Sequence, residues 1–135
     1  MSSWRYKILV EQRTYNIKPG IPMKDFLDNY SSLGLPVQKR LLEGFLGYFT
    51  SEFGLQNQVV HLWAFTDLED RRRRRQLLAE DADWQACIAI VRPMLDSQES
   101  KILYPTAFSP IGSLPVASDD PLTAFNFSPA TASAG

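Results

Sequence analysis

The 135-residue chain has little that could bind a metal or cross-link the fold, because it holds one cysteine, Cys87, and one histidine, His61. A single thiol excludes a disulfide within the chain, and one cysteine with one histidine cannot form a Cys/His zinc site. The chain also lacks any apolar run close to the ~20 residues that cross a bilayer, and it starts without the apolar stretch of a secretory signal peptide. We therefore expect a soluble protein without a membrane span: cytoplasmic, or mitochondrial if a targeting segment has been removed.

The chain also has no large excess of charge of one sign, since its formal net charge is −1. No overall field would attract nucleic acid or anionic lipid. The run of arginines at residues 71–75 suggests a nucleic-acid site at first sight. Consecutive helical residues point all round the helix axis, however, and the acidic residues on both sides can pair with them. We predict a solvated helix surface and no nucleic-acid partner.

The hydrophobic content of 44% is enough for the core of one domain. Helical and strand patterns alternate up to Pro110, and Gly, Ser, Pro, Ala and Thr dominate after it. Such a composition is typical of a tail without a core of its own, although Phe125 and Phe127 are unusual in an idle tail and could dock in a groove. We predict a domain over residues 1–109 and a Pro/Ser/Ala-rich tail over residues 110–135.

Hydrophobic periodicity predicts strands and helices in alternation over the first part of the chain. In chain order we expect a strand at 4–17, helices at 22–33 and 36–42, strands at 44–53 and 57–65, a helix at 66–79, a further helix that ends at Pro93, and a strand at 97–104. Gly34 is expected to end the first helix, and Thr66 with Glu69 to cap the third. The order β-α-β-β-α-β is typical of a ferredoxin-like α+β fold, an antiparallel four-stranded sheet with helices on one face.

Helices on one face leave the other face of the sheet uncovered. Alternation along the first strand separates Leu9, Glu11, Arg13 and Tyr15 from Ile8, Val10, Gln12 and Thr14. We assign the first set to the uncovered face and keep the second set as the alternative. Either set is too apolar to face water in a monomer, so we expect a homodimer in which a second copy covers this face across a two-fold axis.

Four segments, in this order, resemble proteins of the NIPSNAP family. They are residues 11–20 (EQRTYNIKPG), 47–50 (GYFT), 57–63 (NQVVHLW), and 92–95 with 97–99 (RPML and SQE). The resemblance runs from about Tyr6 to about Pro110 and implies the dimeric α/β-barrel fold, which agrees with the element order. Gln12 departs from the family, which usually has an apolar residue there. The family has a poorly established biochemistry, and its animal members are associated with mitochondria and with protein interactions in trafficking or organelle quality control.

Arg13 is the strongest candidate for a binding residue. A guanidinium on an interior strand face is costly unless it is paired, and its planar fork suits a carboxylate. The partner is either a carboxylate of the chain, Glu11 or Glu52, or the carboxylate or enolate of a ligand.

His61 shares one face of its strand with Trp63, either as a pocket group or as an ordinary buried histidine with a hydrogen-bond partner. As a catalyst it would be the general base, since its ordinary pKa lies near neutrality. Arg13 and Tyr15 would then stabilise a developing oxyanion. The remaining ligand-binding candidates are Glu11, Tyr48, Trp63 and Gln98.

These residues predict a small molecule with a carbonyl or carboxylate group as the ligand. The reactions that they could support are proton transfer next to a carbonyl, isomerisation, and cofactor-free monooxygenase-type chemistry. Barrel relatives of the family include haem-using enzymes, but this is an analogy of fold, and only His61 could serve as the axial ligand. We expect no cofactor and no metal. The alternative function is a non-catalytic interaction or scaffold protein that recognises its partner through Phe125, Asn126 and Phe127.

Overall fold

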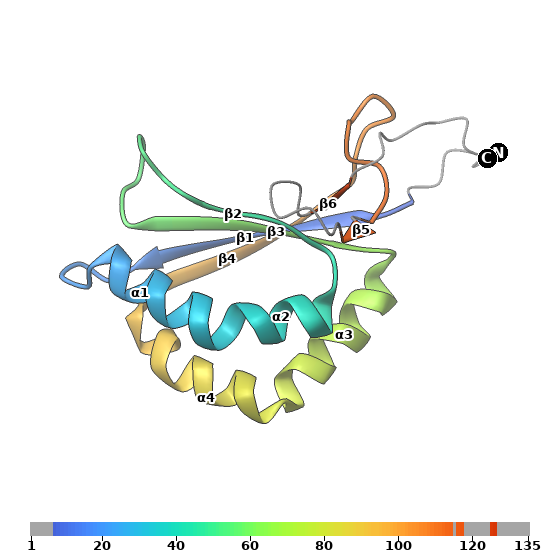
Figure 1. Cartoon of the computed structure of the whole chain (residues 1–135). Coiled ribbons are helices and arrows are strands. Elements are labelled where there is room, and N and C mark those ends of the chain that lie inside the picture. The colour runs from blue at the N-terminus through green and yellow to red at the C-terminus, as the bar shows by residue number, and fades with distance from the viewer. Residues whose placement is uncertain (1–6, 115, 118–124, 127–135) are drawn as a thin grey trace.

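Four strands form one antiparallel sheet in the order β2-β3-β1-β4, and the helices lie on one of its faces (Figure 1). The structure is a computed structural model, and it describes residues 7–114, 116–117 and 125–126. Its elements are β1 (Leu9–Ile17), α1 (Met23–Asn29), the π-helix η1 (Tyr30–Gly34), α2 (Leu35–Leu42), β2 (Phe45–Thr50), β3 (Gln58–Phe65), α3 (Leu68–Glu80), α4 (Ala82–Val91), the 3-10 helix η2 (Arg92–Met94), β4 (Leu95–Leu103), β5 (Val116–Ala117) and β6 (Phe125–Asn126). The predicted β-α-β-β-α-β order and ferredoxin-like fold are confirmed.

One row of residues crosses the whole sheet at its middle. Arg13 of β1 is the Cα partner of His61 on β3 and of Ser100 on β4, and His61 is in turn the partner of Tyr48 on β2. Residues paired in this way project on the same side of an antiparallel sheet. The register alone therefore brings together polar groups that are far apart in the sequence.

This row lies on the side of the sheet that packs against the helices. Trp63 and Phe65 of β3 are fully buried in one core cluster with Leu78 of α3. A second cluster contains Phe26 of α1 and Cys87 of α4. The helices thus bury the faces of β1 and β3 that carry Arg13 and His61.

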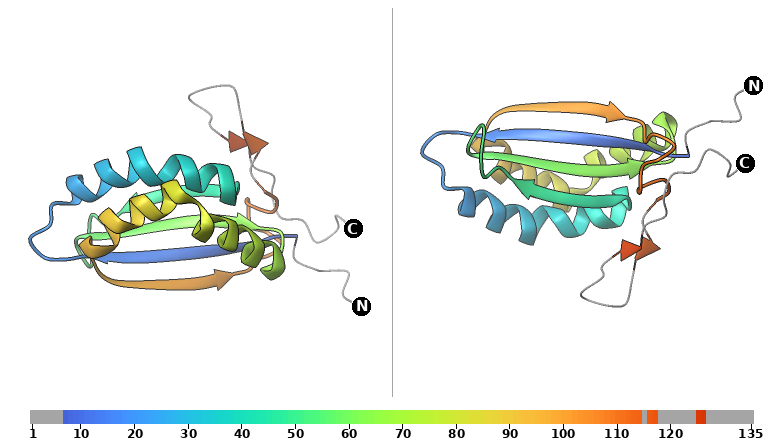
Figure 2. Two further views of the ribbon diagram at one scale, coloured as in Figure 1. Left: turned by 90° about the horizontal axis from the view of Figure 1, so that it is seen from below. Right: turned by 90° about the horizontal axis from the view of Figure 1, so that it is seen from above.

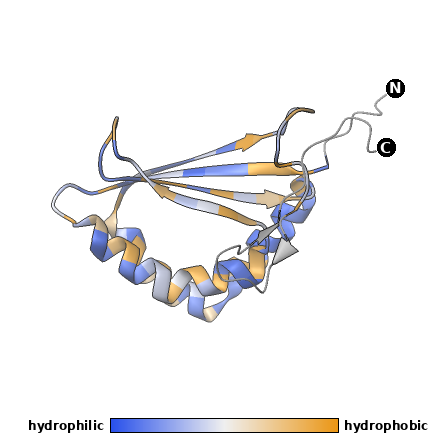
Figure 3. Cartoon of the chain, turned by 45° about the horizontal axis from the view of Figure 1, so that its top comes forward, coloured by the Kyte–Doolittle hydropathy of each residue, from blue (hydrophilic) through white to orange (hydrophobic). Residues whose placement is uncertain are grey.

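The orientation of β1 corrects the first of our two assignments. Leu9 and Glu11 are buried, and with Arg13 and Tyr15 they face the helices, not the uncovered side. The alternative assignment is right for Val10, Gln12 and Thr14, which occupy the uncovered side of β1, whereas Ile8 precedes the strand and is buried. Hydrophobic pattern alone could not separate the two sets, because each combines apolar and polar residues. Figure 3 shows that hydrophilic and hydrophobic stretches alternate along the strands of the sheet.

The first helical region is continuous from Met23 to Leu42, so the expected end at Gly34 is wrong. Gly34 is buried in the π-helix, and a Cβ atom there would approach Cys87 Sγ to 2.7 Å and the Trp84 ring to 3.1 Å. The glycine is therefore needed for close packing against α4 and not to terminate a helix. The π-helical turn also includes the buried Tyr30.

The start of α3 differs by one residue from the expected capping box. The N-cap is Asp67, whose Oδ1 accepts a hydrogen bond from the Asp70 amide at 2.7 Å. The Asp70 carboxylate in turn accepts from the Thr66 amide at 3.0 Å. The reciprocal pattern is retained, and the acidic residues of the first turn serve the helix terminus.

Beyond β4 the structure describes one further pairing, Val116 with Asn126 and Ala117 with Phe125 in β5 and β6. Phe127 lies outside the described residues, so the predicted recognition segment and the domain boundary near Pro110 stay predictions. Over the parts of the chain that are described, no helix has the length and apolar character needed to cross a membrane.

Candidate functional site

A buried carboxylate, Glu11, is the centre of an ion-pair cluster between β1 and α3. It accepts a hydrogen bond from Arg13 Nη1 at 3.0 Å and two from Arg71, from Nε at 3.0 Å and Nη2 at 2.9 Å. Of the two carboxylates that could pair with Arg13, Glu11 is therefore the partner, and Glu52 is exposed. Burial alone would raise the pKa of Glu11, but the hydrogen bonds from Arg71 and the charges of Arg13, Arg71 and Arg75 lower that pKa to about 2.

Arg13 also links β1 to the edge strand. Its Nε donates to Tyr15 Oη at 3.1 Å, and its Nη1 donates to Ser100 Oγ at 2.9 Å. Its side chain keeps 12% of its surface exposed. The hydroxyl of Ser100 was not among the predicted site residues; the register of β4 against β1, not its own sequence pattern, brings it to Arg13.

His61 is fully buried, and Trp63 determines which nitrogen of its neutral ring carries the proton. The indole Nε1 donates to His61 Nδ1 at 2.7 Å. Because an indole N–H can only donate, Nδ1 carries no proton and the neutral ring is protonated at Nε2. Burial and the charge of Arg13 lower the pKa of His61 to about 3, so the ring is neutral at physiological pH. His61 is thus arranged as a neutral hydrogen-bond donor, which differs from the general base that its ordinary pKa suggested.

Aromatic rings enclose the imidazole. Tyr48 stacks on it with ring centroids 4.5 Å apart, and Tyr15 meets it edge-on at 4.8 Å. Tyr30 also stacks against Tyr48 at 4.7 Å and lies 6.5 Å from the imidazole, and its hydroxyl donates to Gln38 Oε1. The aromatic wall predicted from the sequence is present, with Tyr30 of the π-helix as an added member.

Two buried polar atoms of this cluster, Tyr48 Oη and His61 Nε2, have no hydrogen-bond partner among the described residues. Leaving a buried donor unsatisfied costs about 1–3 kcal/mol. Burial also raises the pKa of Tyr48, so its hydroxyl stays protonated. Both groups can donate a hydrogen bond to an acceptor such as a carbonyl oxygen.

The predicted residues thus come together, with one exception. The side facing the helices carries Glu11, Arg13, Tyr15, Tyr48, His61 and Trp63 on neighbouring strands. Gln98 is the Cα partner of Tyr15 but lies exposed on β4. The sequence reading missed Arg71, since the arginine run was expected to be wholly solvated. Arg71 lies one helical turn before Arg75 and two turns before Leu78, which is buried. This spacing would have indicated that Arg71 is on the inward face of the helix.

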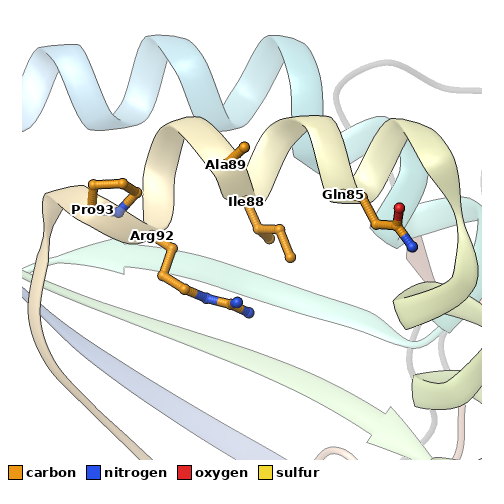
Figure 4. A pocket seen from close by; sticks show the side chains of 5 residues that line it. All are labelled: Gln85, Ile88, Ala89, Arg92 and Pro93. Atoms are coloured by element: carbon orange, nitrogen blue, oxygen red, sulfur yellow. The ribbon is translucent and has the colours of Figure 1, made fainter.

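A hollow of about 420 Å³ lies along α4, lined by Gln85, Ile88, Ala89, Arg92 and Pro93. Figure 4 shows Gln85, Ile88 and Arg92 extending from the helix toward the strands. The helices do not cover β4, which runs along the free edge of the sheet (Figure 2), and both Ser100 and Gln98 are exposed. The Ser100 hydroxyl that accepts from Arg13 therefore lies at an exposed edge of the sheet.

The described residues do not suit a metal or a haem. They contain no group of three His, Cys, Asp or Glu side chains that could hold a metal ion. A metal-ligating histidine normally donates its second ring N–H to an acceptor. In His61 the second nitrogen accepts from Trp63, which places the proton on the nitrogen that would have to bind iron.

Comparison with known proteins identifies the family. The NIPSNAP family model matches residues 10–110. The chain belongs to the NIPSNAP family. A NipSnap homolog of Dictyostelium discoideum is 39% identical over 95 residues, which are 70% of this chain and 41% of that protein. The Drosophila melanogaster NipSnap protein is 31% identical over 104 residues, 77% of this chain and 37% of its own length. The chain thus spans less than half of these curated NIPSNAP relatives.

Solved structures of bacterial NIPSNAP proteins cover the chain more fully. A NIPSNAP family protein of Agrobacterium tumefaciens is 40% identical with a TM-score of 0.74, over 76% of this chain and 97% of that one. A NIPSNAP-like domain protein of Burkholderia xenovorans is 35% identical with a TM-score of 0.77, over 86% and 100% of the two chains. A proposed antibiotic biosynthesis monooxygenase of Nitrosomonas europaea, over 74% of this chain and 91% of that one, is 10% identical with a TM-score of 0.56. This last likeness shows a shared fold.

Proposed function

We propose that this NIPSNAP protein binds a small metabolite with a carbonyl or carboxylate group between the helices and the sheet of each protomer. The observation that carries the proposal is the pair of buried, unpartnered donors, Tyr48 Oη and His61 Nε2, in the same row of the sheet as Arg13. Buried donors without partners are rare in folded proteins because they are costly. A ligand oxygen that accepts from both would remove this cost.

The same groups support cofactor-free chemistry on the bound carbonyl compound. A neutral imidazole N–H and a nearby guanidinium both stabilise negative charge that develops on a carbonyl oxygen. Stabilising the enolate form makes the neighbouring C–H more acidic, so proton transfer or isomerisation is the class of reaction we propose. In this scheme His61 holds the oxygen and does not remove the proton.

We further propose that two copies of the chain pack face to face through the uncovered side of the sheet. This side holds a hollow of about 340 Å³ whose apolar walls include Val10, Leu62 and Leu103. Phe49 and Leu103 expose 53% and 40% of their surface here. A strand surface of this kind is normally covered by another protein surface, and a two-fold pair would bury both copies at once.

Native mass spectrometry tests both parts of the proposal. We expect a dimer that carries additional mass per protomer after gentle purification, or after incubation with acetoacetate or its methyl ester. Arg13→Ala should abolish the added mass and retain the dimer, whereas Lys18→Ala, which removes an exposed cation beyond β1, should change neither. A dimer that stays at the sequence mass under all these conditions would contradict ligand binding and favour the non-catalytic interaction protein.

A further inference from the structure

Arg75 differs from the other arginines of its run. It is half-buried on α3, yet it forms no hydrogen bond or ion pair with any described residue. Arg72 pairs with Glu69, and Arg73 pairs with Asp70. Arg74 pairs with Asp70 and Glu43, and Arg71 pairs with Glu11. Arg75 thus has no carboxylate partner among the described residues and is also partly withdrawn from solvent. Withdrawing an unpaired charge from water is costly.

The surroundings of Arg75 carry an excess of positive charge. Arg75 interacts electrostatically with Arg13, Arg71 and Glu11, so three guanidinium groups share one carboxylate. Burial and the charge of Arg13 lower the pKa of Arg75, and the charge of Arg75 in turn contributes to the lowered pKa of His61. A compensating anion in this region would relieve the repulsion among these cations.

Part of this positive charge, on Arg13, lies beside the exposed edge of the sheet. Arg13 is partly exposed and is bonded to Ser100 on the uncovered edge strand. The hollow along α4, with Arg92 among its lining residues, lies on the same side of the sheet (Figure 4). Guanidinium groups bind planar anions such as carboxylates through paired hydrogen bonds.

We infer that Arg75 and Arg13 form a carboxylate subsite beside the carbonyl-binding donors of Tyr48 and His61, so that the ligand is a small oxo acid and not a neutral ketone or aldehyde. The inference rests on the proposed function, since it adds a second anchoring point to the same ligand. The oxo group meets the neutral donors and the acid group meets the cations. Arg75 acts here as a binding residue.

The test compares acetoacetate with its neutral methyl ester on the full-length protein by isothermal titration calorimetry. We expect the wild type to bind the acid at least about tenfold more tightly than the ester. Arg75→Gln should lose this preference and leave ester binding unchanged. The matched control is Arg72→Gln on the same helix, an exposed arginine paired with Glu69, and it should bind both compounds like the wild type.

A second readout does not depend on the ligand. If Arg75 is an uncompensated cation, Arg75→Gln should raise the melting temperature of the ligand-free protein, whereas loss of a structural ion pair would lower it. A lowered melting temperature together with unchanged acid binding would overturn the subsite and leave the proposed function standing. If neither compound binds the wild type, the proposed function fails and the subsite fails with it.

Discussion

Trp63 Nε1 lies 2.7 Å from His61 Nδ1, and this single hydrogen bond determines which nitrogen of the imidazole carries the proton. The bond also removes the nitrogen that a general base would otherwise use, because Nδ1 already accepts. The remaining polar atom, Nε2, is buried without a partner among the described residues. The proposed role of His61 as a donor to a ligand oxygen depends on this neighbour, which is two residues away on the same strand.

We predict that the imidazole of His61 stays neutral, as the Nε2–H tautomer, throughout the physiological pH range. The chain holds a single histidine, so a long-range ¹H–¹⁵N NMR spectrum of the imidazole nitrogens reports on this residue alone. The signals should not titrate between about pH 5 and 8. A titration midpoint near the ordinary value of 6.5 would contradict the lowered pKa and its cause, burial beside Arg13. Trp63→Phe should raise the midpoint, because it removes the hydrogen bond that favours the neutral ring.

The protein should lose stability as the pH falls from about 6.5. The pKa of His61 changes from 6.5 in the unfolded chain to about 3 in the folded one, so the unfolded state binds more protons between these values. The free energy of unfolding therefore falls with decreasing pH, by at most about 1.4 kcal/mol per pH unit. Glu11, whose pKa changes from 4.5 to about 2, adds a further loss only below pH 4.5. Urea unfolding at a series of pH values measures this profile.

The variant His61→Gln separates the contributions of His61 and Glu11 to the pH dependence of stability. The variant should have a nearly flat stability profile between about pH 6.5 and 5, because its amide does not titrate, and it should keep the steep loss below pH 4.5 that belongs to Glu11. The comparison uses the slope and not the absolute stability, so a general destabilisation by the substitution does not affect the conclusion. An unchanged slope in the variant would assign the effect to another group.

Neutralising Glu11 should destabilise the fold strongly. Glu11→Gln leaves Arg13 and Arg71 without their buried carboxylate, and removing one member of a buried ion pair typically costs about 3–5 kcal/mol. Glu69→Gln is the matched control, because its pair with Arg72 is exposed and exposed pairs contribute little. Urea denaturation should show a large decrease in the midpoint for the first variant and none for the second. Equal decreases for both variants would mean that the buried ion pairs of Glu11 contribute no more to stability than the exposed pair of Glu69.

A charge on the uncovered side of the sheet should separate the proposed dimer. Leu103→Glu introduces a carboxylate beside Val10, its Cα partner on β1, and should give a monomer in analytical ultracentrifugation. Leu77→Glu serves as the control, since Leu77 is 47% exposed but lies on α3, away from this side. We expect it to remain dimeric at the same concentration. A dimer that survives Leu103→Glu would place the interface elsewhere.

The sequence was sufficient for the order of elements, because strand-like segments such as residues 57–65 are separated from segments that carry apolar residues at helical spacing. It was not sufficient for the orientation of β1. Leu9 and Val10 are both apolar, and Glu11 and Gln12 are both polar, so a shift by one residue preserves the pattern. In the observed orientation Glu11 pairs with Arg71, on a helix far along the chain, and Leu9 enters the core.

The other differences have similar physical causes. Gly34 looked like a helix terminus, but its lack of a side chain serves contact with Cys87, which no local pattern reveals. The ordinary pKa of His61 suggested a base, but burial and Arg13 change that pKa. The arginine run was expected to be solvated, which holds for Arg72 and Arg73, with 61% and 55% of their side chains exposed. For Gly34 and Arg71 the deciding contact joins residues on different elements, and for His61 the charge of Arg13 on β1 adds to the effect of burial.

The alternation of β1 also limits how this family member can change over evolutionary time. The same strand carries Glu11, Arg13 and Tyr15 on its helix-facing side and Val10, Gln12 and Thr14 on the other. Point substitutions can alter one side while the other is conserved. An insertion or deletion of a single residue within Leu9–Ile17 would exchange the two sides, and the ion-pair cluster and the surface proposed for the second copy would be lost together.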